Sequence, residues 1–230
     1  MSIDAKYLLL LGNYGSGKTE LALAFALEKR KRAEGRVVLV DLDIVNPYFR
    51  SGEKRSLLEA EGIELLLPFF ALSSVDAPSL PAQIQSVFES AYDHVIIDVG
   101  GDESGAAALG RYHPYLSALR AQLTTLYVIN PLRPFSGTTE DILSLFALIE
   151  RRARIRPDFL VNNANLQNET TPADLIQAQA LLEEVAKRLG IPIGMVTGEE
   201  RLRAGLPLPM QRRFFPIRPL MRPEWMEEVP

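Results

Sequence analysis

The amino-acid sequence predicts an α/β fold with three layers, in which helices flank a mainly parallel central sheet. Six short apolar runs alternate with segments rich in helix-forming residues, a pattern typical of parallel strands joined by helices. A glycine-rich loop also lies between the first apolar run and the first helical segment. The 230 residues are enough for one domain with a substantial core.

The apolar runs define the expected strands, which cover residues 7–11, 36–40, 94–97, 123–129, 159–161 and 191–196. The second run contains Val37-Val38-Leu39-Val40 without interruption, as expected of a strand that is covered on both faces. A further candidate strand lies at 63–67, where Pro68 ends the apolar run.

Helices are expected between these runs, at residues 51–60, 81–91, 106–121, 138–153 and 173–189, and directly after the glycine-rich loop. Apolar residues in the last of these segments recur with a period close to 3.6. Thr171 and Pro172 are typical of a helix start, and Gly190 is typical of a helix end.

The glycine-rich loop runs from Gly12 to Thr19 and fits the pattern G-x-x-x-x-G-K-[ST]. In this motif the backbone N–H groups surround a β-phosphate, the lysine, here Lys18, reaches the β and γ oxygens, and the Thr19 hydroxyl binds Mg²⁺. The helix that follows adds its positive dipole end to the phosphate site. The alternative is a plain glycine turn between core elements, and the strand–loop–helix context favours phosphate binding.

A first candidate acid for the metal ion, Asp98, follows the apolar run at 94–97. An acid after four apolar-leaning residues is the Walker B pattern, and this carboxylate is expected to hold Mg²⁺ directly or through water. Gly101 completes a D-x-x-G sequence, which lets a backbone N–H approach the γ-phosphate. The alternative is that Asp98 caps the next helix.

Two further acids, Asp41 and Asp43, follow the strand at 36–40. Alternate residues of a strand point the same way, so both carboxylates are expected to face the phosphate crevice. One would support the water shell of Mg²⁺ and the other would orient the attacking water. Ordinary turn chemistry is the alternative, because Asp, Asn and Pro favour turns.

These three segments together resemble the MinD/ParA/CobQ-type nucleotide-binding family, a branch of P-loop NTPases that includes ArsA-like ATPases. The resemblance covers about residues 5–200 and implies a P-loop NTPase fold. It implies that Asp43 polarises the attacking water, that Asp41 and Asp98 serve Mg²⁺, and that Asn162 contacts adenine. Residues 162–165 lack the Lys and Asp of the guanine-reading motif N-K-x-D, so ATP is expected rather than GTP.

The motif and the resemblance together assign the candidate site. The catalytic candidates are Asp43 and Lys18, and the metal ligands are Thr19, Asp41 and Asp98. The expected nucleotide-binding residues are Gly12, Asn13, Tyr14, Gly15, Ser16, Gly17, Lys18, Thr19, Glu20 and Asn162.

The loop departs from this family at its second position, where Asn13 stands in place of a signature lysine. An extra cation at the γ-phosphate is worth roughly 10³–10⁵ in rate, so its absence weakens the case for fast, dimer-triggered hydrolysis. Arg50, Lys54 and Arg55 follow Asp43 in a segment that either closes over phosphate or forms a solvated helix face. The solvated face is the favoured interpretation.

The leading functional hypothesis is a Mg²⁺-dependent ATPase that acts as a switch, with mobile loops near 46–52 and 100–105. A small-molecule phosphotransferase is one alternative, for which Arg151, Arg152, Arg154 and Arg156 would supply a lid over the phosphates. The other alternative is a nucleotide-binding module that hydrolyses little and docks a partner, and Asn13 is its best argument.

Composition excludes several other classes of protein. The chain has no cysteine and two histidines, so thiolate sites are excluded and a histidine-built zinc site is not expected. A net charge of −4 gives no overall footprint for nucleic acid. No apolar stretch approaches the roughly 18 residues that span a membrane, and residues 1–6 do not resemble a signal peptide. We therefore expect a cytoplasmic protein.

The segment from 201 to 230 differs from the first 200 residues because it is rich in proline, arginine and apolar anchors. We expect the nucleotide-binding domain at 1–200 and an extended arm at 201–230 that packs back on the domain. The alternative is a contact with a second copy in a homodimer or with another protein, since Arg, Met and aromatic residues are enriched at interfaces.

Overall fold

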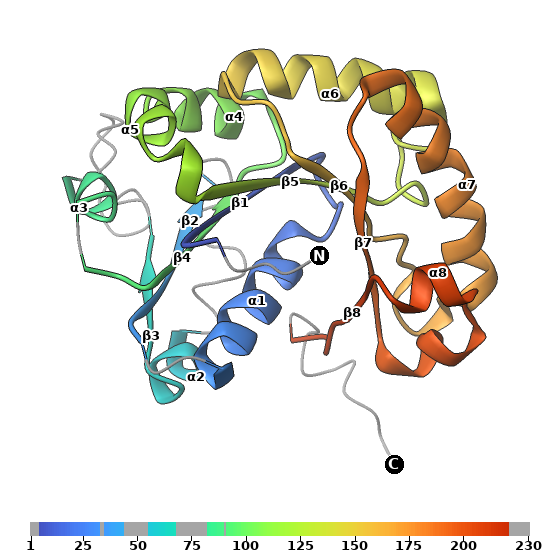
Figure 1. Ribbon diagram of the computed structural model, residues 1–230, viewed down its shortest axis with the longest axis horizontal. Helices are drawn as coiled ribbons and strands as arrows, with labels where there is room; N and C mark the ends of the chain where they lie inside the picture. Colours follow the sequence, from blue (N-terminus) through green and yellow to red (C-terminus); the bar gives the residue numbers. More distant parts are fainter. Residues whose placement is uncertain (1–4, 33–34, 44–54, 68–81, 90, 221–230) are drawn as a thin grey trace.

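The computed structural model describes residues 5–32, 35–43, 55–67, 82–89 and 91–220 (Figure 1). Eight strands form one sheet in the order β3-β2-β4-β1-β5-β6-β7-β8. Every neighbouring pair in this sheet is parallel. The predicted three-layer α/β fold is therefore confirmed.

The strands are β1 (Tyr7–Gly12), β2 (Val37–Leu42), β3 (Ile63–Leu66), β4 (His94–Val99), β5 (Leu123–Ile129), β6 (Phe159–Asn162), β7 (Ile193–Gly198) and β8 (Phe214–Pro216). The helices are α1 (Lys18–Arg32), α2 (Arg55–Ala60), α3 (Ala82–Ser86), α4 (Glu103–Gly110), α5 (His113–Ala118), α6 (Thr139–Ala153), α7 (Pro172–Leu189) and α8 (Leu208–Gln211). Short 3-10 turns lie at η3 (Arg120–Gln122), η4 (Gln167–Glu169) and η5 (Glu200–Gly205).

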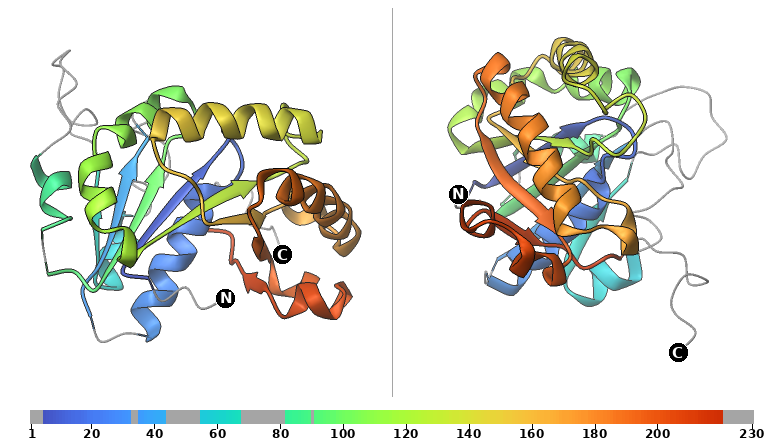
Figure 2. Two further views of the ribbon diagram at one scale, coloured as in Figure 1. Left: turned by 45° about the horizontal axis from the view of Figure 1, so that its top comes forward. Right: turned by 90° about the vertical axis from the view of Figure 1, so that its right-hand side faces the viewer.

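The sheet lies between two helical layers, which Figure 2 shows from the side. Every residue of β1 is buried, because successive side chains point to opposite faces and both faces are covered. Leu9 and Leu11 belong to the core beneath α4 to α7, whereas Leu8 and Leu10 pack with α1 and α2. A central strand covered in this way needs an unbroken apolar run, as the sequence has.

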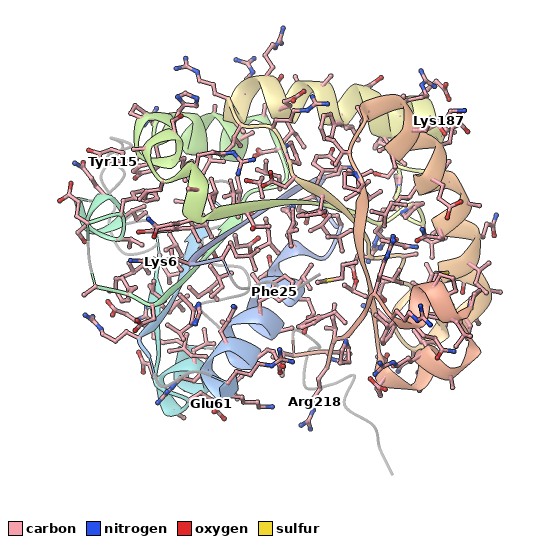
Figure 3. The ribbon with its side chains drawn as sticks, viewed as in Figure 1. Lys6, Phe25, Glu61, Tyr115, Lys187 and Arg218 are labelled. Carbon is pink, nitrogen blue, oxygen red and sulfur yellow. The ribbon has the colours of Figure 1, made fainter. Side chains whose placement is uncertain are left out.

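Phe25 of α1 is buried in the core on the face of the sheet that α1 and α2 cover (Figure 3). The Phe25 ring lies 4.7 Å, centroid to centroid, from the ring of Phe215 on β8. This contact packs β8 against α1, the helix that follows the glycine-rich loop, although the two residues are far apart in the sequence.

The helix expected at 106–121 is two helices, α4 and α5, which are separated at Arg111 and Tyr112. Pro114 lies in the first turn of α5, where its missing N–H is tolerated but from which a helix cannot continue backwards unbroken. By contrast, α7 begins and ends where expected. Thr171 forms a capping box with Asp174, and Gly190 adopts a left-handed conformation at the end of the helix.

The segment after residue 200, expected as an extended arm, contributes η5, α8 and β8 to the fold. Strand β8 extends the sheet in parallel beside β7, and Phe214 and Met210 belong to a small core that includes Val196. Two of the prolines lie at element boundaries, with Pro207 before α8 and Pro216 at the last residue of β8. Residues 221–230 lie outside the described part of the chain.

Candidate functional site

The glycine-rich loop connects β1 to α1 in a backbone conformation that depends on its glycines. Gly12, Gly15 and Gly17 have φ angles of 147°, 73° and 86°, a region that other residues rarely adopt. Space is also short, because a Cβ atom on Gly12 would lie 2.2 Å from the carbonyl oxygen of Val128. The sequence pattern and the local geometry therefore agree.

Lys18 begins α1 and folds back across the loop. Its Nζ donates a hydrogen bond of 3.0 Å to the carbonyl oxygen of Asn13, and the side chain is only 6% exposed. The first amides of α1 have no acceptor within the helix and carry the positive end of the helix dipole. Lysine and helix end together form an environment suited to phosphate.

The acidic residues lie on the β4 side of the loop. The Thr19 hydroxyl donates a 2.6 Å hydrogen bond to Oδ2 of Asp98, and Asp98 itself stands beside Asp41 in the register of β4 and β2. Both carboxylates are buried. The Asp43 amide donates a 2.8 Å bond to Oδ1 of Asp41, and Asp43 Oδ1 lies 3.3 Å from where a Cβ atom of Gly100 would stand.

This donor set fits magnesium, which prefers hard oxygen ligands and keeps several waters. The Thr19 hydroxyl and the Asp98 carboxylate are already in contact, and Asp41 is the next acid along the sheet edge. Within the described residues, no group of three His, Cys, Asp or Glu side chains could hold an ion alone. An Mg²⁺ ion held by one or two carboxylates usually takes its other ligands from phosphate oxygens and water.

The loop after β4 touches the glycine-rich loop directly. A Cβ atom on Gly101 would lie 2.5 Å from the amide nitrogen of Tyr14, so the two backbones are in close contact. The residue that caps α4 is Asp102, whose side chain accepts a 2.8 Å bond from the Gly105 amide. Helix capping, the alternative considered for Asp98, is thus carried out by Asp102.

The β5 side of the loop brings residues that the sequence motifs did not indicate. Residues 130–138 follow β5, and Ser136 Oγ accepts a 3.2 Å hydrogen bond from Nδ2 of Asn13. The side chain of Arg133 lies 3.8 Å from the position of a Cβ atom on Gly15. The buried Asn130 amide holds this segment, since it contacts the backbone of Leu132 and Asn165.

A second residue missed by the motifs is Asn163, which follows β6. Its Nδ2 donates a 2.6 Å hydrogen bond to the carbonyl oxygen of Ser16, and its Oδ1 accepts a bond from the Thr197 hydroxyl. A Cβ atom on Gly17 would lie 2.3 Å from Nδ2 of Asn163. Asn163 therefore holds the backbone of the glycine-rich loop through Ser16. Its only signal in the sequence is a polar run after an apolar strand.

Asn162, the residue expected to contact adenine, is completely buried. Its Nδ2 donates to the carbonyl oxygen of Leu175 at 3.0 Å and to the side chain of Gln179 at 3.3 Å, and its Oδ1 accepts from the Ala164 amide. The side chain thus binds α7 in this structure. Contact with a base stays a prediction.

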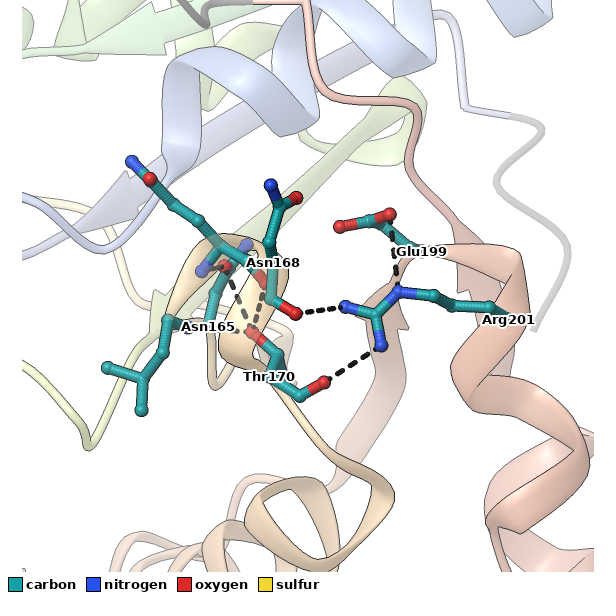
Figure 4. A network of polar contacts seen from close by, with 7 residues as sticks. Asn165, Asn168, Thr170, Glu199 and Arg201 are labelled. Atoms are coloured by element: carbon teal, nitrogen blue, oxygen red, sulfur yellow. Dashed lines mark hydrogen bonds and ion pairs between the residues drawn. The ribbon is translucent and has the colours of Figure 1, made fainter. Parts of the chain in front are cut away.

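Further along this edge, Arg201 joins the segments after β6 and β7 (Figure 4). Its guanidinium donates to the carbonyl oxygens of Thr170 and Asn168, at 3.1 and 2.9 Å, and its Nε lies 3.5 Å from Glu199. The Thr170 hydroxyl in turn contacts Asn165. Arg201, from the segment expected as an extended arm, therefore connects the segments that follow β6 and β7.

The remaining candidates lie elsewhere. Arg55 is exposed and pairs with Glu59 at 3.6 Å, as a solvated helix face requires, whereas Arg50, Lys54 and the loop expected at 46–52 fall outside the described residues. Glu20 accepts a hydrogen bond from the Leu220 amide.

The arginines considered for a phosphate lid lie at the far end of α6. Arg151, Arg152 and Arg154 line a hollow of about 390 Å³ beside the end of α4. Twelve residues separate Arg151 from the start of α6 at Thr139, which is roughly 18 Å along a helix.

Several solved structures share this fold. FtsY from the chloroplast of Physcomitrella patens matches with a TM-score of 0.54 and 17% identity, over 85% of this chain and 59% of that chain. The cell division protein FtsY from Thermotoga maritima has a TM-score of 0.52 and 18% identity, over 85% and 64%. FlhF in complex with GTP and Mg²⁺ has a TM-score of 0.52 and 17% identity, over 85% and 66%.

These similarities establish the fold, which this chain shares with FtsY and FlhF. The chain spans less than two thirds of the length of each of these structures. No protein-family model matches the sequence, and no curated protein matches it. The narrower resemblance to the MinD/ParA/CobQ-type family stays a prediction. In the described residues, no helix has both the length and the apolar character needed to cross a membrane.

Proposed function

We propose that this protein binds a nucleoside triphosphate with Mg²⁺ and hydrolyses it as a nucleotide-controlled switch. The observation that carries the proposal is the hydrogen bond between Thr19 and Asp98, which joins the glycine-rich loop to the acid of β4 beside the buried Lys18. Burying a lysine and a carboxylate at the same loop is costly, and bound phosphate and Mg²⁺ would offset that cost.

Each residue of the site would have a defined role. The loop amides and Lys18 bind the β and γ oxygens, while Thr19, Asp98 and Asp41 hold the metal ion and its water shell. Mg²⁺ in this position supplies positive charge to the phosphate oxygens. Asp43 is the proposed residue that orients the attacking water. The complex of FlhF with GTP and Mg²⁺ supports this use of the fold.

A switch also needs a segment that responds to the γ-phosphate. The backbone contact between Gly101 and Tyr14 lies directly before α4, which Asp102 caps. A movement of the glycine-rich loop on binding the γ-phosphate would therefore be passed to α4 through Gly101 and Asp102. Nothing in the described residues favours the phosphotransferase, because the arginines that would form its lid lie at the far end of α6.

ATP is the proposed ligand, because residues 162–165 lack the Lys and Asp of the guanine-reading motif. GTP is the second candidate, since FlhF binds it on a similar fold and Asn162 is engaged with α7. Titration of both nucleotides with the same protein decides between the two.

The test is calorimetric titration of the purified chain with Mg·ATP and Mg·GTP. We expect one of them to bind, and Lys18→Ala to weaken its binding by about 10- to 100-fold, because charge-assisted hydrogen bonds are worth about 1.5–3 kcal/mol. Lys187→Ala, which removes an exposed lysine on α7, is the matched control and should change nothing. Absence of binding, or equal binding by Lys18→Ala, contradicts the proposal. Phosphate release without an added acceptor separates hydrolysis from phosphotransfer.

A further inference from the structure

The segment after β5 is positioned to act on whatever binds the glycine-rich loop. Strands β1 and β5 are neighbours, and Gly12 is paired in register with Val128, so the chains leaving both strands start side by side. Asn13 and Ser136 then connect the two segments by a hydrogen bond. The residue of this segment nearest the middle of the loop is Arg133, beside Gly15.

The backbone around Arg133 is fixed. The Arg133 amide donates to the carbonyl oxygen of Asn130, and the Arg133 carbonyl oxygen accepts from the Ser136 amide. Phe135 has a φ of 61° although it is not glycine, and its side chain is 78% exposed. An apolar residue held in this conformation costs free energy, and such strain concentrates at functional sites.

The charge of Arg133 is not used in an ion pair within the described part of the chain. The residue is exposed. The acids of the site, Asp41 and Asp98, lie on β2 and β4, on the other side of β1. A guanidinium there is available to bind an anion, and its planar fork suits phosphate oxygens.

The position along the loop indicates which phosphate Arg133 would contact. Lys18 binds the β and γ oxygens in loops of this kind, and its Nζ lies at the carbonyl of Asn13. The half of the loop from Asn13 to Gly15 therefore borders the γ end. The other half, from Gly17 to Thr19, leads into the helix. Arg133 lies against the first half.

We propose that Arg133 binds the γ-phosphate and makes the site prefer a nucleoside triphosphate to the corresponding diphosphate. This inference rests on the proposed function. It assigns to the β5 side of the loop a phosphate-binding role that the motifs do not indicate, with the hydrogen bond between Asn13 and Ser136 holding the segment in place.

The experiment compares Arg133→Ala with the wild-type chain by calorimetry, using the non-hydrolysable triphosphate AMP-PNP or GMP-PNP and the corresponding diphosphate, all with Mg²⁺. We expect triphosphate affinity to fall about 10- to 100-fold, as for loss of a charge-assisted hydrogen bond, and diphosphate affinity to change less than about twofold. Arg133→Lys keeps the charge but not the fork and should lie between the two. Arg151→Ala, on the far end of α6, is the matched control.

The possible results separate the two proposals. If the wild-type chain binds no nucleotide, the proposed function fails. If the wild-type chain binds and Arg133→Ala binds each nucleotide as tightly as the wild-type chain does, only the role of Arg133 is wrong. An equal loss for both nucleotides also contradicts a γ-phosphate contact. Thermal unfolding of each variant shows whether it is folded, and Arg133→Lys provides the same test if the alanine variant is not.

Discussion

The two loops that flank the glycine-rich loop are built from different chemistry. On the β4 side, the buried carboxylate of Asp98 accepts a hydrogen bond from Thr19, and the backbone at Gly101 closely approaches the loop backbone. On the β5 side, the contacts are a neutral hydrogen bond to Ser136 and an exposed arginine. One side is suited to a metal ion and the other to the phosphate itself. The two proposals together predict that the two charges of a metal–phosphate complex would be recognised from opposite sides of β1.

The largest expected effect is on the acidic side. Asp98→Asn keeps the shape of the side chain but removes its charge, so affinity for the Mg²⁺–nucleotide complex should fall about 10- to 100-fold. Affinity in the variant should then depend little on Mg²⁺, which titration with EDTA measures. Asp102→Asn is the control from the same loop, since asparagine caps helices as well as aspartate. A variant Asp98→Asn that retains full Mg²⁺ dependence would remove Asp98 from the metal site.

The next effect concerns backbone packing. It compares the cost in stability of adding one methyl group on each side of the loop. Gly101→Ala places a Cβ atom 2.5 Å from the Tyr14 amide nitrogen, and overpacking of this kind costs about 3 kcal/mol. Gly137→Ala, on the β5 side, meets its nearest atom only at 3.8 Å and should cost less than about 1 kcal/mol. Chemical denaturation of both variants gives the two free energies of unfolding. Equal losses would mean that the β4 side does not hold the loop more tightly.

The support from β6 is expected to contribute somewhat less. Asn163→Ala removes the side-chain hydrogen bonds to the Ser16 carbonyl and the Thr197 hydroxyl, of which the hydroxyl still contacts the Asn162 carbonyl. A buried polar group that loses its partner costs about 1–3 kcal/mol, so we expect a loss of about 2 kcal/mol in unfolding free energy. Asn168→Ala, an exposed position on η4, is the comparison. If the two variants are equally stable, Asn163 does not brace the loop.

The smallest effect tests α7, the helix that the Asn162 side chain contacts. Hydrogen bonds from the Thr171 hydroxyl and amide hold the pKa of Asp174 below its usual value. A lowered pKa in the folded state stabilises the protein above the unfolded value of about 3.9 and ceases to do so as the pH falls through the folded value. Asp174→Ala should therefore lower stability by about 0.5–1 kcal/mol at pH 7 and by much less near pH 2. Thermal unfolding at both pH values measures this, and a loss that does not depend on pH would exclude the charge as its cause.

The candidate site residues on the β4 side of the glycine-rich loop are easier to predict from the sequence than those on the β5 side. The glycine-rich loop, Asp41 and Asp98 could be predicted because their chemistry is encoded in short motifs at strand ends. Arg133 and Ser136 could not, because they meet the loop only through the pairing of β1 with β5, and no local pattern marks them.

Two other differences have a similar origin. Asn162 ends β6 and Asn163 follows it, yet one contacts α7 and the other contacts the glycine-rich loop. Sequence alone does not show which of two adjacent asparagines meets which element. Strand β8 has three residues and ends in Pro216, which is too short and too proline-rich to stand out as a strand in a segment with six prolines.

The most direct test of the central claim is an experimental structure with a non-hydrolysable triphosphate and Mg²⁺. We expect phosphates along Gly12 to Thr19, the metal ion at Thr19 and Asp98, and the Arg133 guanidinium within hydrogen-bonding distance of the γ-phosphate. A nucleotide bound away from this loop, or a metal ion held without Thr19 and Asp98, would contradict it.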